Sequence, residues 1–432
     1  MIIQEFSFGN FKSFKDLQTL NLAAAKIVSK NKKLDKTNVF KISDDENLFL
    51  KSKAIYGANA SGKSNISKAL VSFIRIVKLS IKDEKILRLI DSFKLSTETE
   101  NEPTFFQLIF WHNNIKYRYG FELNENDILA EWLYSTPKQR ELPLFIREGL
   151  KIIEVDKTNF SEGSKLVELL TEGDGDNDIF RNNSLFLSTV GSFGFGKLSK
   201  SIIDAISSII VISGLGHPGM YDFASDSIKD EKMKKYIVDF LKYGDVGIED
   251  LDSIEISKNE KNESKENNEI ESNNTLVIAK RKKYNSNYEL VDNEIFPFEN
   301  ESEGTQKLFE LSPFIYKSIN SNRPLIIDEF DARFHPLLTK KIVELFNSDN
   351  NKNSQLIFIT HDTNLLSPEL LRRDQIDFVE KDKYGGSHLF SLAEFKGIRN
   401  TASFEKDYIN GKYGAIPFLG DFNKIINSDK DA

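Results

Sequence analysis

Residues 55–65 read Ile-Tyr-Gly-Ala-Asn-Ala-Ser-Gly-Lys-Ser-Asn, which fits the pattern G-x-x-x-x-G-K-[ST] of a phosphate-binding loop, or P-loop. The apolar residues before Gly57 predict a buried strand that leads into the loop. After the loop, apolar residues recur at helical spacing, at Ile66, Leu70, Phe73, Ile74 and Val77. Strand, loop and helix in this order are the context that the motif requires, so a chance glycine-rich turn is the weaker interpretation.

The residue types of the loop point to a nucleoside triphosphate as its ligand. Gly57 and Gly62 permit backbone conformations that a Cβ would hinder, so successive N–H groups can curl around a phosphate at the start of the following helix. The Lys63 side chain is expected to reach the β- and γ-phosphates, and the Ser64 hydroxyl to bind Mg²⁺. The predicted ATP-binding residues are therefore Gly57, Ala58, Asn59, Ala60, Ser61, Gly62, Lys63, Ser64 and Asn65.

The composition sets the broad class of the protein. A chain of 432 residues predicts two or three domains, and 39% hydrophobic residues suffice for a sizeable core. The net charge of −8 argues against a generally basic nucleic-acid binder, although it does not exclude a local basic groove. The chain has no cysteine, which excludes disulfides and thiolate metal sites. Neither a signal peptide nor an apolar run of roughly 20 residues is present, so we expect a cytoplasmic protein without membrane contact.

The hydrophobic pattern divides the chain into three parts. Residues 1–90 contain alternating strands over 1–22, the P-loop, and a helix predicted to run to about residue 90. Residues 91–294 form an insertion that is predicted to be β-rich over 91–155 and mainly helical over 160–245, including Lys200–Ile212. No heptad pattern persists there, which argues against a coiled coil. Segment 257–274 has almost no apolar side chains, which predicts a mobile loop or hairpin tip.

Residues 295–432 alternate between helical and strand patterns. We predict helices over Gly304–Ser318 and Pro336–Asn347, a short helix over Ser367–Arg373, and strands over Pro324–Ile327, Ser354–Thr360, Gln375–Glu380 and His388–Leu392. This alternation is typical of an α/β protein with a mostly parallel sheet.

Two of these strands end in polar residues that complement a P-loop. The first ends in Asp328 and Glu329, where Asp328 is placed to hold Mg²⁺ and Glu329 to act as general base on the attacking water. The second ends in His361, which can contact the γ-phosphate and hold that water. Strands commonly end in exposed acids, and a lone histidine after a strand usually has no function. The P-loop and the spacing of one helix and one strand between the two tips favour the functional interpretation.

A third segment, Glu299 to Lys307, precedes the helix that starts near Gly304. Ser302 and Gly304 could present a hydroxyl and backbone N–H groups to a phosphate at the helix N-terminus. Ser302 is also a good N-cap, and taken alone the N-cap interpretation would prevail. The position just ahead of the strand that ends in Asp328 strengthens the phosphate-binding alternative.

These pieces, in this order, resemble the ABC-type ATPases of the SMC and RecF class. In that class Ser302-x-Gly304-x-Gln306 corresponds to the signature motif, although Glu301 stands where leucine is usual. The resemblance implies that Asp331 begins the D-loop, that His361 is the switch histidine, and that Gln107 is a candidate for the Q-loop glutamine. It further implies an ABC-type P-loop ATPase head with a mixed sheet, built from 1–90 and 295–432, with 91–294 inserted between P-loop and signature motif.

The tail segments 371–382 and 395–400 are similar to those of the bacterial RloA and abortive-infection AbiL ATPases. This resemblance implies an ATPase that acts as sensor or switch of an anti-phage defence system. It implies ATP bridged between two heads of a homodimer or larger homo-oligomer, with Lys63 of one copy and Ser302 and Gly304 of the other on one nucleotide. A separately encoded effector, RloB-like or another toxin or nuclease, would be the partner, and DNA is a further candidate.

Three alternatives differ in function class. A DNA-repair or SMC-like clamp acting on DNA ends would need a long coiled coil or a zinc hook, for which the chain has neither heptads nor cysteines. A nuclease with a Toprim domain would need an Asp-x-Asp pair after another strand beyond Glu380, and none follows. A transporter ATPase subunit usually lacks so large an insertion between P-loop and signature.

Overall fold

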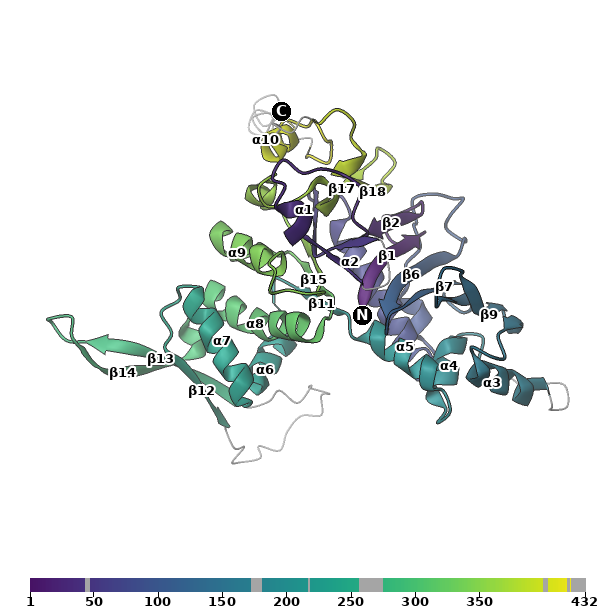
Figure 1. Ribbon diagram of the computed structural model, residues 1–432, viewed down its shortest axis with the longest axis horizontal. Helices are drawn as coiled ribbons and strands as arrows, with labels where there is room; N and C mark the ends of the chain where they lie inside the picture. The colour runs from purple at the N-terminus through teal and green to yellow at the C-terminus, as the bar shows by residue number, and fades with distance from the viewer. Residues whose placement is uncertain are drawn as a thin grey trace, which may run out of the picture.

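The computed structural model describes residues 1–42, 47–171, 181–216, 218–255, 275–398, 403–417 and 420. Two sheets and the helix that follows the P-loop, α2 (Lys63–Leu79), form the centre of the molecule, and a smaller lobe lies to one side (Figure 1). The predicted mobile loop over 257–274 lies outside the described residues.

The sheet that carries the P-loop has the strand order β11-β15-β16-β5-β17-β18. Its strands are β5 (Ser52–Gly57), β11 (Ile210–Ser213), β15 (Leu325–Asp328), β16 (Leu356–Ile359), β17 (Ile376–Lys381) and β18 (Ser387–Ser391). All neighbouring pairs are parallel except β17 with β18. Strands β5 and β16 are buried on both faces, as is typical of strands inside a parallel sheet. This mixed, mostly parallel sheet with its P-loop confirms the predicted ABC-type ATPase head.

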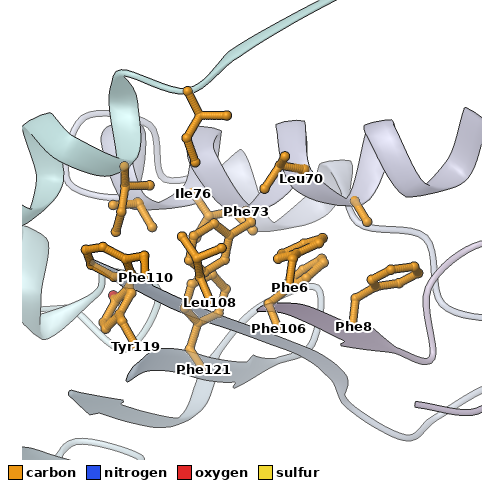
Figure 2. Packing of buried hydrophobic residues seen from close by; sticks show 14 of the residues in the cluster. Phe6, Phe8, Leu70, Phe73, Ile76, Phe106, Leu108, Phe110, Tyr119 and Phe121 are labelled. Carbon is orange, nitrogen blue, oxygen red and sulfur yellow. The ribbon is translucent and has the colours of Figure 1, made fainter. Parts of the chain in front are cut away.

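The second sheet is antiparallel, with the order β10-β9-β8-β7-β6-β1-β2. Its strands are β1 (Ile2–Gly9), β2 (Gln18–Asn21), β6 (Thr104–His112), β7 (Ile115–Leu123), β8 (Ile128–Thr136), β9 (Leu142–Glu148) and β10 (Lys151–Val155). Alternate residues of β1, β6 and β7 point toward α2, and Figure 2 shows their aromatic rings around Phe73. The rings of Phe73 and Phe121 stack with centroids 5.3 Å apart. The sheet therefore supports the helix that follows the P-loop.

Strand β1 lies between β2 and β6, so this sheet combines residues from 1–90 with residues from the predicted insertion 91–294. The sheet crosses the sequence boundary at residue 90, and segment 91–155 packs as part of the head. The division into 1–90, 91–294 and 295–432 stays a proposal about how the sequence is organised.

A buried ion pair between β8 and β9 of the second sheet also contacts the start of α4 (Phe186–Ser192), which lies between α3 (Ser161–Thr171) and α5 (Lys197–Ser207) in the sequence. Arg147 and Glu131 are fully buried and 3.2 Å apart. Glu131 also accepts hydrogen bonds from the backbone N–H groups at the start of α4, at 2.6 Å and 3.0 Å. Every oxygen of this carboxylate is thereby satisfied, as a buried charge requires.

The side lobe contains the three-stranded sheet β12-β13-β14 and three helices. Its elements are α6 (Pro218–Ser227), α7 (Glu231–Tyr243), β12 (Asp250–Glu255), β13 (Thr275–Tyr284), β14 (Leu290–Pro297) and α8 (Glu303–Ser321). These elements share a hydrophobic cluster of their own, and the β13–β14 hairpin projects away from the centre (Figure 1). The N-terminus of α8, with the predicted signature motif, therefore belongs to this lobe.

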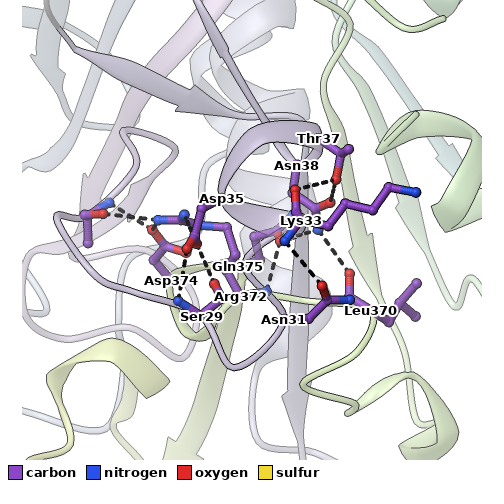
Figure 3. A network of polar contacts seen from close by, with 11 residues as sticks. Ser29, Asn31, Lys33, Asp35, Thr37, Asn38, Leu370, Arg372, Asp374 and Gln375 are labelled. Atoms are coloured by element: carbon purple, nitrogen blue, oxygen red, sulfur yellow. Dashed lines mark hydrogen bonds and ion pairs between the residues drawn. The ribbon is translucent and has the colours of Figure 1, made fainter. Parts of the chain in front are cut away.

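The remaining elements complete the described part of the chain. They are α1 (Leu34–Thr37), β3 (Val39–Lys41), β4 (Leu48–Leu50), α9 (Pro336–Phe346) and α10 (Phe404–Ile409), with one-turn 3-10 helices at Ile86–Leu89, Phe298–Asn300, Thr363–Leu365, Arg373–Gln375 and Leu392–Glu394. Arg372 donates to Asp35 at 2.6 Å and to Asp374 at 2.9 Å (Figure 3). This network joins the segment before β3 to the segment before β17.

Three predicted helices differ from those observed. The helix after the P-loop ends at Leu79 rather than near residue 90, and a turn and a 3-10 helix follow it. Residues 210–212, predicted as the end of a helix, belong to β11, because their β-branched side chains complete the edge of the parallel sheet beside β15. Residues 367–372 form turns rather than a helix, since Pro368 and the hydrogen bonds to Ser367 close the chain locally.

Candidate active site

The P-loop connects β5 to α2 and wraps around its own lysine. Gly62 has a φ of 107° and Ala60 a φ of 60°, so the loop makes the left-handed turns that curl its N–H groups inward. Lys63 Nζ donates to the carbonyls of Gly57 and Ala58, each at 2.9 Å. Burial lowers the pKa of Lys63, while the neighbouring carboxylates, Glu329 first, oppose that shift.

The end of β15 meets the start of α2. Ser64 Oγ donates to Asp328 Oδ1 at 3.1 Å, and Ser67 Oγ donates to Asp328 Oδ2 at 3.1 Å. The two predicted magnesium ligands are thus neighbours, although 264 residues separate them in sequence. Among the described residues no three His, Asp or Glu side chains gather as a metal site. One hydroxyl and one carboxylate fit Mg²⁺, which takes hard oxygen ligands and completes its shell with phosphate oxygens and water.

Glu329 and His361 follow the ends of the neighbouring strands β15 and β16. Glu329 is half-buried and has a φ of 54°, a left-handed conformation that is costly for glutamate and that turns the chain sharply after Asp328. Asp331 accepts from the Thr360 hydroxyl at 2.6 Å and from the His361 N–H at 3.0 Å. These bonds fix the two strand ends to each other. Burial, followed by the nearby Lys63, lowers the pKa of His361, so the imidazole is neutral at pH 7.

These side chains line one cavity of about 430 Å³, which is within the usual range for small-molecule sites. Its lining residues are Asn59, Ala60, Ser61, Gly62, Lys63, Ser64, Asn65, Glu329, His361 and Lys381. The structure therefore brings together the P-loop and the two strand tips that the sequence singled out. Lys381 was missed by the sequence analysis. The available signal was its place at the carboxyl end of β17, since ligands of open α/β sheets bind outside the carboxyl ends of the strands.

The residues of the predicted signature motif lie elsewhere in the chain's own fold. Ser302 is the N-cap of α8, and its Oγ accepts from the Thr305 N–H at 3.2 Å. Gln306 Nε2 donates to the carbonyls of Glu299 and Glu301, both at 2.9 Å. Neither these residues nor Gly304 are among the described residues that line the P-loop cavity. Their predicted contact with ATP stays a prediction, and it requires a second copy of the chain.

The Q-loop candidate Gln107 lies within β6 and not at the cavity. Its Oε1 accepts from Trp132 Nε1 at 3.1 Å and from Arg118 at 3.4 Å. It lies on the face of the sheet opposite to α2, because Phe106 and Leu108 beside it point to the core. A role for Gln107 at the P-loop is therefore wrong, since its side chain is held on the far face of the sheet.

Lys307 connects α8 to the turn that follows Glu329. The residue is 3% exposed, and its Nζ donates to the carbonyls of Phe330, at 3.0 Å, and Ala332. The same ammonium lies 4.1 Å from the centre of the Phe334 ring. Burial lowers the pKa of Lys307 to about 8, although the surrounding carboxylates of Asp331, Glu329 and Glu310 partly offset that effect. Helix α8 and the turn that follows Glu329 are thus joined by one buried cation.

This buried cation predicts a pH-dependent stability. The pKa of Lys307 is about 8 in the folded chain against 10.5 ordinarily, so the unfolded chain binds more protons between pH 8 and pH 10.5. The free energy of unfolding of the parent, relative to a Lys307→Met variant, should therefore rise with pH across that window, by up to about 3 kcal/mol. Urea unfolding of both proteins at pH 7.5, 8.5 and 9.5 measures the difference. A difference that stays constant over this range would contradict the assignment.

The fold and the cavity together define a P-loop ATPase head of the ABC type, with paired carboxylates and a histidine opposite the P-loop. The chain belongs to the family described as "AAA domain, putative AbiEii toxin, Type IV TA system", which matches residues 54–367. A search of curated proteins returned no match. No helix in the described part of the chain is long and apolar enough to cross a membrane.

Three solved structures illustrate the structural similarity. The SMC head domain from Thermotoga maritima has a TM-score of 0.42 and 14% identity, over 90% of this chain and 99% of that chain. The SmcHead bound to the C-winged helix domain of ScpA has a TM-score of 0.42 and 17% identity, over 90% and 97%. An Smc head domain with an extended coiled coil, bound to the C-terminal domain of ScpA derived from Pyrococcus furiosus, has a TM-score of 0.37 and 16% identity, over 95% and 99%.

Proposed function

We propose that this chain hydrolyses ATP to ADP and phosphate at the P-loop cavity. The observation that supports this most strongly is the convergence of Lys63, Ser64, Glu329 and His361 on one cavity from three separate strand ends, with Asp328 hydrogen-bonded to Ser64. The loop Gly57–Asn65 binds the phosphates, and Lys63 neutralises the β- and γ-phosphates. Ser64 and Asp328 hold Mg²⁺, which when bound neutralises the charge that develops on the phosphate oxygens.

In this proposal Glu329 and His361 position the attacking water from opposite sides. Glu329 accepts a proton from the water as it attacks the γ-phosphorus, because Glu329 lines the cavity and directly follows Asp328, whose carboxylate accepts from the Glu329 N–H at 3.1 Å. His361, neutral at pH 7, donates or accepts one hydrogen bond and thereby orients the water or the γ-phosphate. The hydrogen bond from the His361 backbone N–H to the Asp331 carboxylate keeps His361 at that place.

We further propose that two copies of the chain complete each site, with Ser302, Gly304 and Gln306 of one copy at the P-loop of the other. The N-terminus of α8 carries unpaired N–H groups and a partial positive charge, which suit a phosphate. Loss of the γ-phosphate would then remove contacts from both copies and let them separate. Lys307 would transmit this change to the Glu329 turn, to which it is bonded.

The biological role that we propose is that of a cytoplasmic sensor or switch in abortive infection, controlling a separately encoded effector. The description of the matching family names a toxin of a toxin–antitoxin system, and this supports a role in such defence. A DNA clamp of the SMC kind is less favoured, because it needs long coiled-coil helices. The longest helix in the described ranges is α8, with 19 residues.

Steady-state ATP hydrolysis across a range of protein concentrations tests the proposal, with Lys63→Ala as control. Specific activity that rises with concentration and vanishes in the control is the expected result, since two copies form each site. Activity that persists in Lys63→Ala would place the chemistry outside the P-loop and overturn the proposal. Activity independent of concentration would require the mass of the assembly to be measured, and an active monomer would contradict the shared site.

A further inference from the structure

The β17–β18 hairpin forms a wall of the P-loop cavity that none of the sequence motifs covers. Strand β17 runs parallel to β5 with Val379 opposite Gly57, so the two strands end side by side. Lys381 is the last residue of β17, and its side chain is exposed and lines the cavity together with Asn59–Asn65. A second lysine therefore lines the same cavity as Lys63, and it comes from a different strand.

Hydrogen bonds fasten this hairpin to the P-loop. Ser387, at the start of β18, is fully buried, and its hydroxyl donates to the carbonyl of Ser61 at 2.6 Å. Its N–H donates to the carbonyl of Ser13 at 2.7 Å. Asn65 Nδ2 in turn donates to Ser13 Oγ at 2.8 Å. A Cβ at Gly62 would collide with both hydroxyls, so the three segments are in close contact. The position of Lys381 relative to the loop is therefore set by direct bonds.

The turn after Lys381 is equally well fixed, and its hydrogen bonds engage the carboxylate of Asp382, the next residue in the chain. The Asp382 carboxylate accepts from the N–H groups of Tyr384 and Gly386 at 2.8 Å and 2.9 Å, and it lies 3.1 Å from His388 Nε2. Among the described residues no ion pair of Lys381 is formed. The Lys381 ammonium is thus left facing a cavity built for phosphates, next to an acid that is already engaged by the turn.

We propose that Lys381 is a second phosphate-binding lysine of this site and takes part in binding the nucleoside triphosphate. This inference rests on the proposed function and extends it to a residue outside the P-loop and the two strand tips. Lys63 is buried and bonded to two carbonyls of its own loop, so it contributes one fixed charge. A triphosphate carries several negative charges, and the exposed Lys381 supplies a further cation on a long, adaptable stem.

Equilibrium binding of Mg-ATP to the full chain, by titration calorimetry, tests this role. Lys381→Ala is expected to weaken binding about tenfold, which is the usual effect of losing one charge-assisted hydrogen bond. Lys381→Arg, which keeps the charge, should bind within about threefold of the parent. Lys383→Ala is the matched control, because Lys383 lies two residues further along the turn, near the Tyr384 ring and outside the cavity lining. Its affinity should equal that of the parent.

The outcomes separate this inference from the proposed function. If Lys381→Ala binds Mg-ATP as tightly as the parent while Lys63→Ala does not bind, the role of Lys381 is overturned and the ATP site stands. If Lys381→Arg binds as weakly as Lys381→Ala, the charge is not what matters, and the inference fails. If the parent itself binds no Mg-ATP, the proposed function fails with it. Because Lys381 is exposed, the melting temperature of its variants should match that of the parent. A lower melting temperature would mean that Lys381 stabilises the fold, and it would overturn the proposal that its role is to bind the nucleotide.

Discussion

Glu329→Gln is expected to reduce ATP turnover by about 10²- to 10⁴-fold, the usual contribution of a general base, and to leave ATP binding intact. Glutamine has the shape of glutamate but cannot accept the proton of the attacking water. The Lys63, Ser64 and Asp328 contacts to the phosphates and Mg²⁺ remain. Single-turnover hydrolysis measures the chemical step, and binding of Mg-ATP measured separately shows that the site is still loaded.

The same variant should hold the assembly in its ATP-bound form. If two copies share each nucleotide, then a chain that binds ATP without hydrolysing it stays associated, and its mass in the presence of ATP should be that of the dimer or larger oligomer. Glu369→Gln serves as control, because Glu369 is exposed, pairs with Lys30 and lies outside the cavity. Parental turnover in Glu329→Gln would show that another group takes the proton.

Mixing two inactive variants should restore activity if the site is shared. Lys63→Ala removes the P-loop cation, and Ser302→Arg places a bulky cation at the N-terminus of α8. Each protein alone should be inactive, since both sites of its dimer lack one half. A mixed dimer contains one site with an intact P-loop from one chain and an intact Ser302 from the other. An equal mixture should therefore reach about a quarter of the parental activity.

The control for this experiment is a mixture of Lys63→Ala with the double variant Lys63→Ala/Ser302→Arg, in which no intact site can form. Activity in the first mixture and none in the second would establish that Ser302 acts on the P-loop of the partner. If Ser302→Arg alone were fully active, Ser302 would have no role at the partner's P-loop. Its only role would then be to cap α8 within its own chain.

The sequence predicted those parts of the site whose chemistry is local. The P-loop and the two strand tips at Asp328 and His361 are each contained within about ten residues of sequence, and each has a recognisable apolar strand before it. Their convergence could be predicted as well, because parallel strands place their carboxyl ends at one edge of a sheet. The structure then adds the distances, such as the 3.1 Å between Ser64 and Asp328.

Features that depend on distant partners were beyond the sequence. The run Ile210–Ser213 follows a helix and continues its apolar pattern, and only its pairing with Leu325–Asp328 makes it a strand. A lysine in a helical pattern, such as Lys307, gives no sign that its ammonium will be buried against backbone carbonyls of a later turn. In the sequence Lys381 looks like any other surface lysine. Its place at the P-loop cavity depends on the pairing of β17 with β5, which the sequence does not reveal.

The position of β5 also has a consequence for synthesis of the protein. This strand, which ends at Gly57, is paired on one side with Leu356–Ile359 and on the other with Ile376–Lys381. A chain emerging from the ribosome exposes its P-loop early, yet both neighbours of the strand that carries it are made some 300 residues later, at a rate of about 5–20 residues per second. The sheet cannot close until then, because such non-local pairing must wait for its partners. ATP binding is therefore expected only late in translation, and a chain interrupted before Ile376 would carry the whole P-loop on a strand that has only one of its two neighbours.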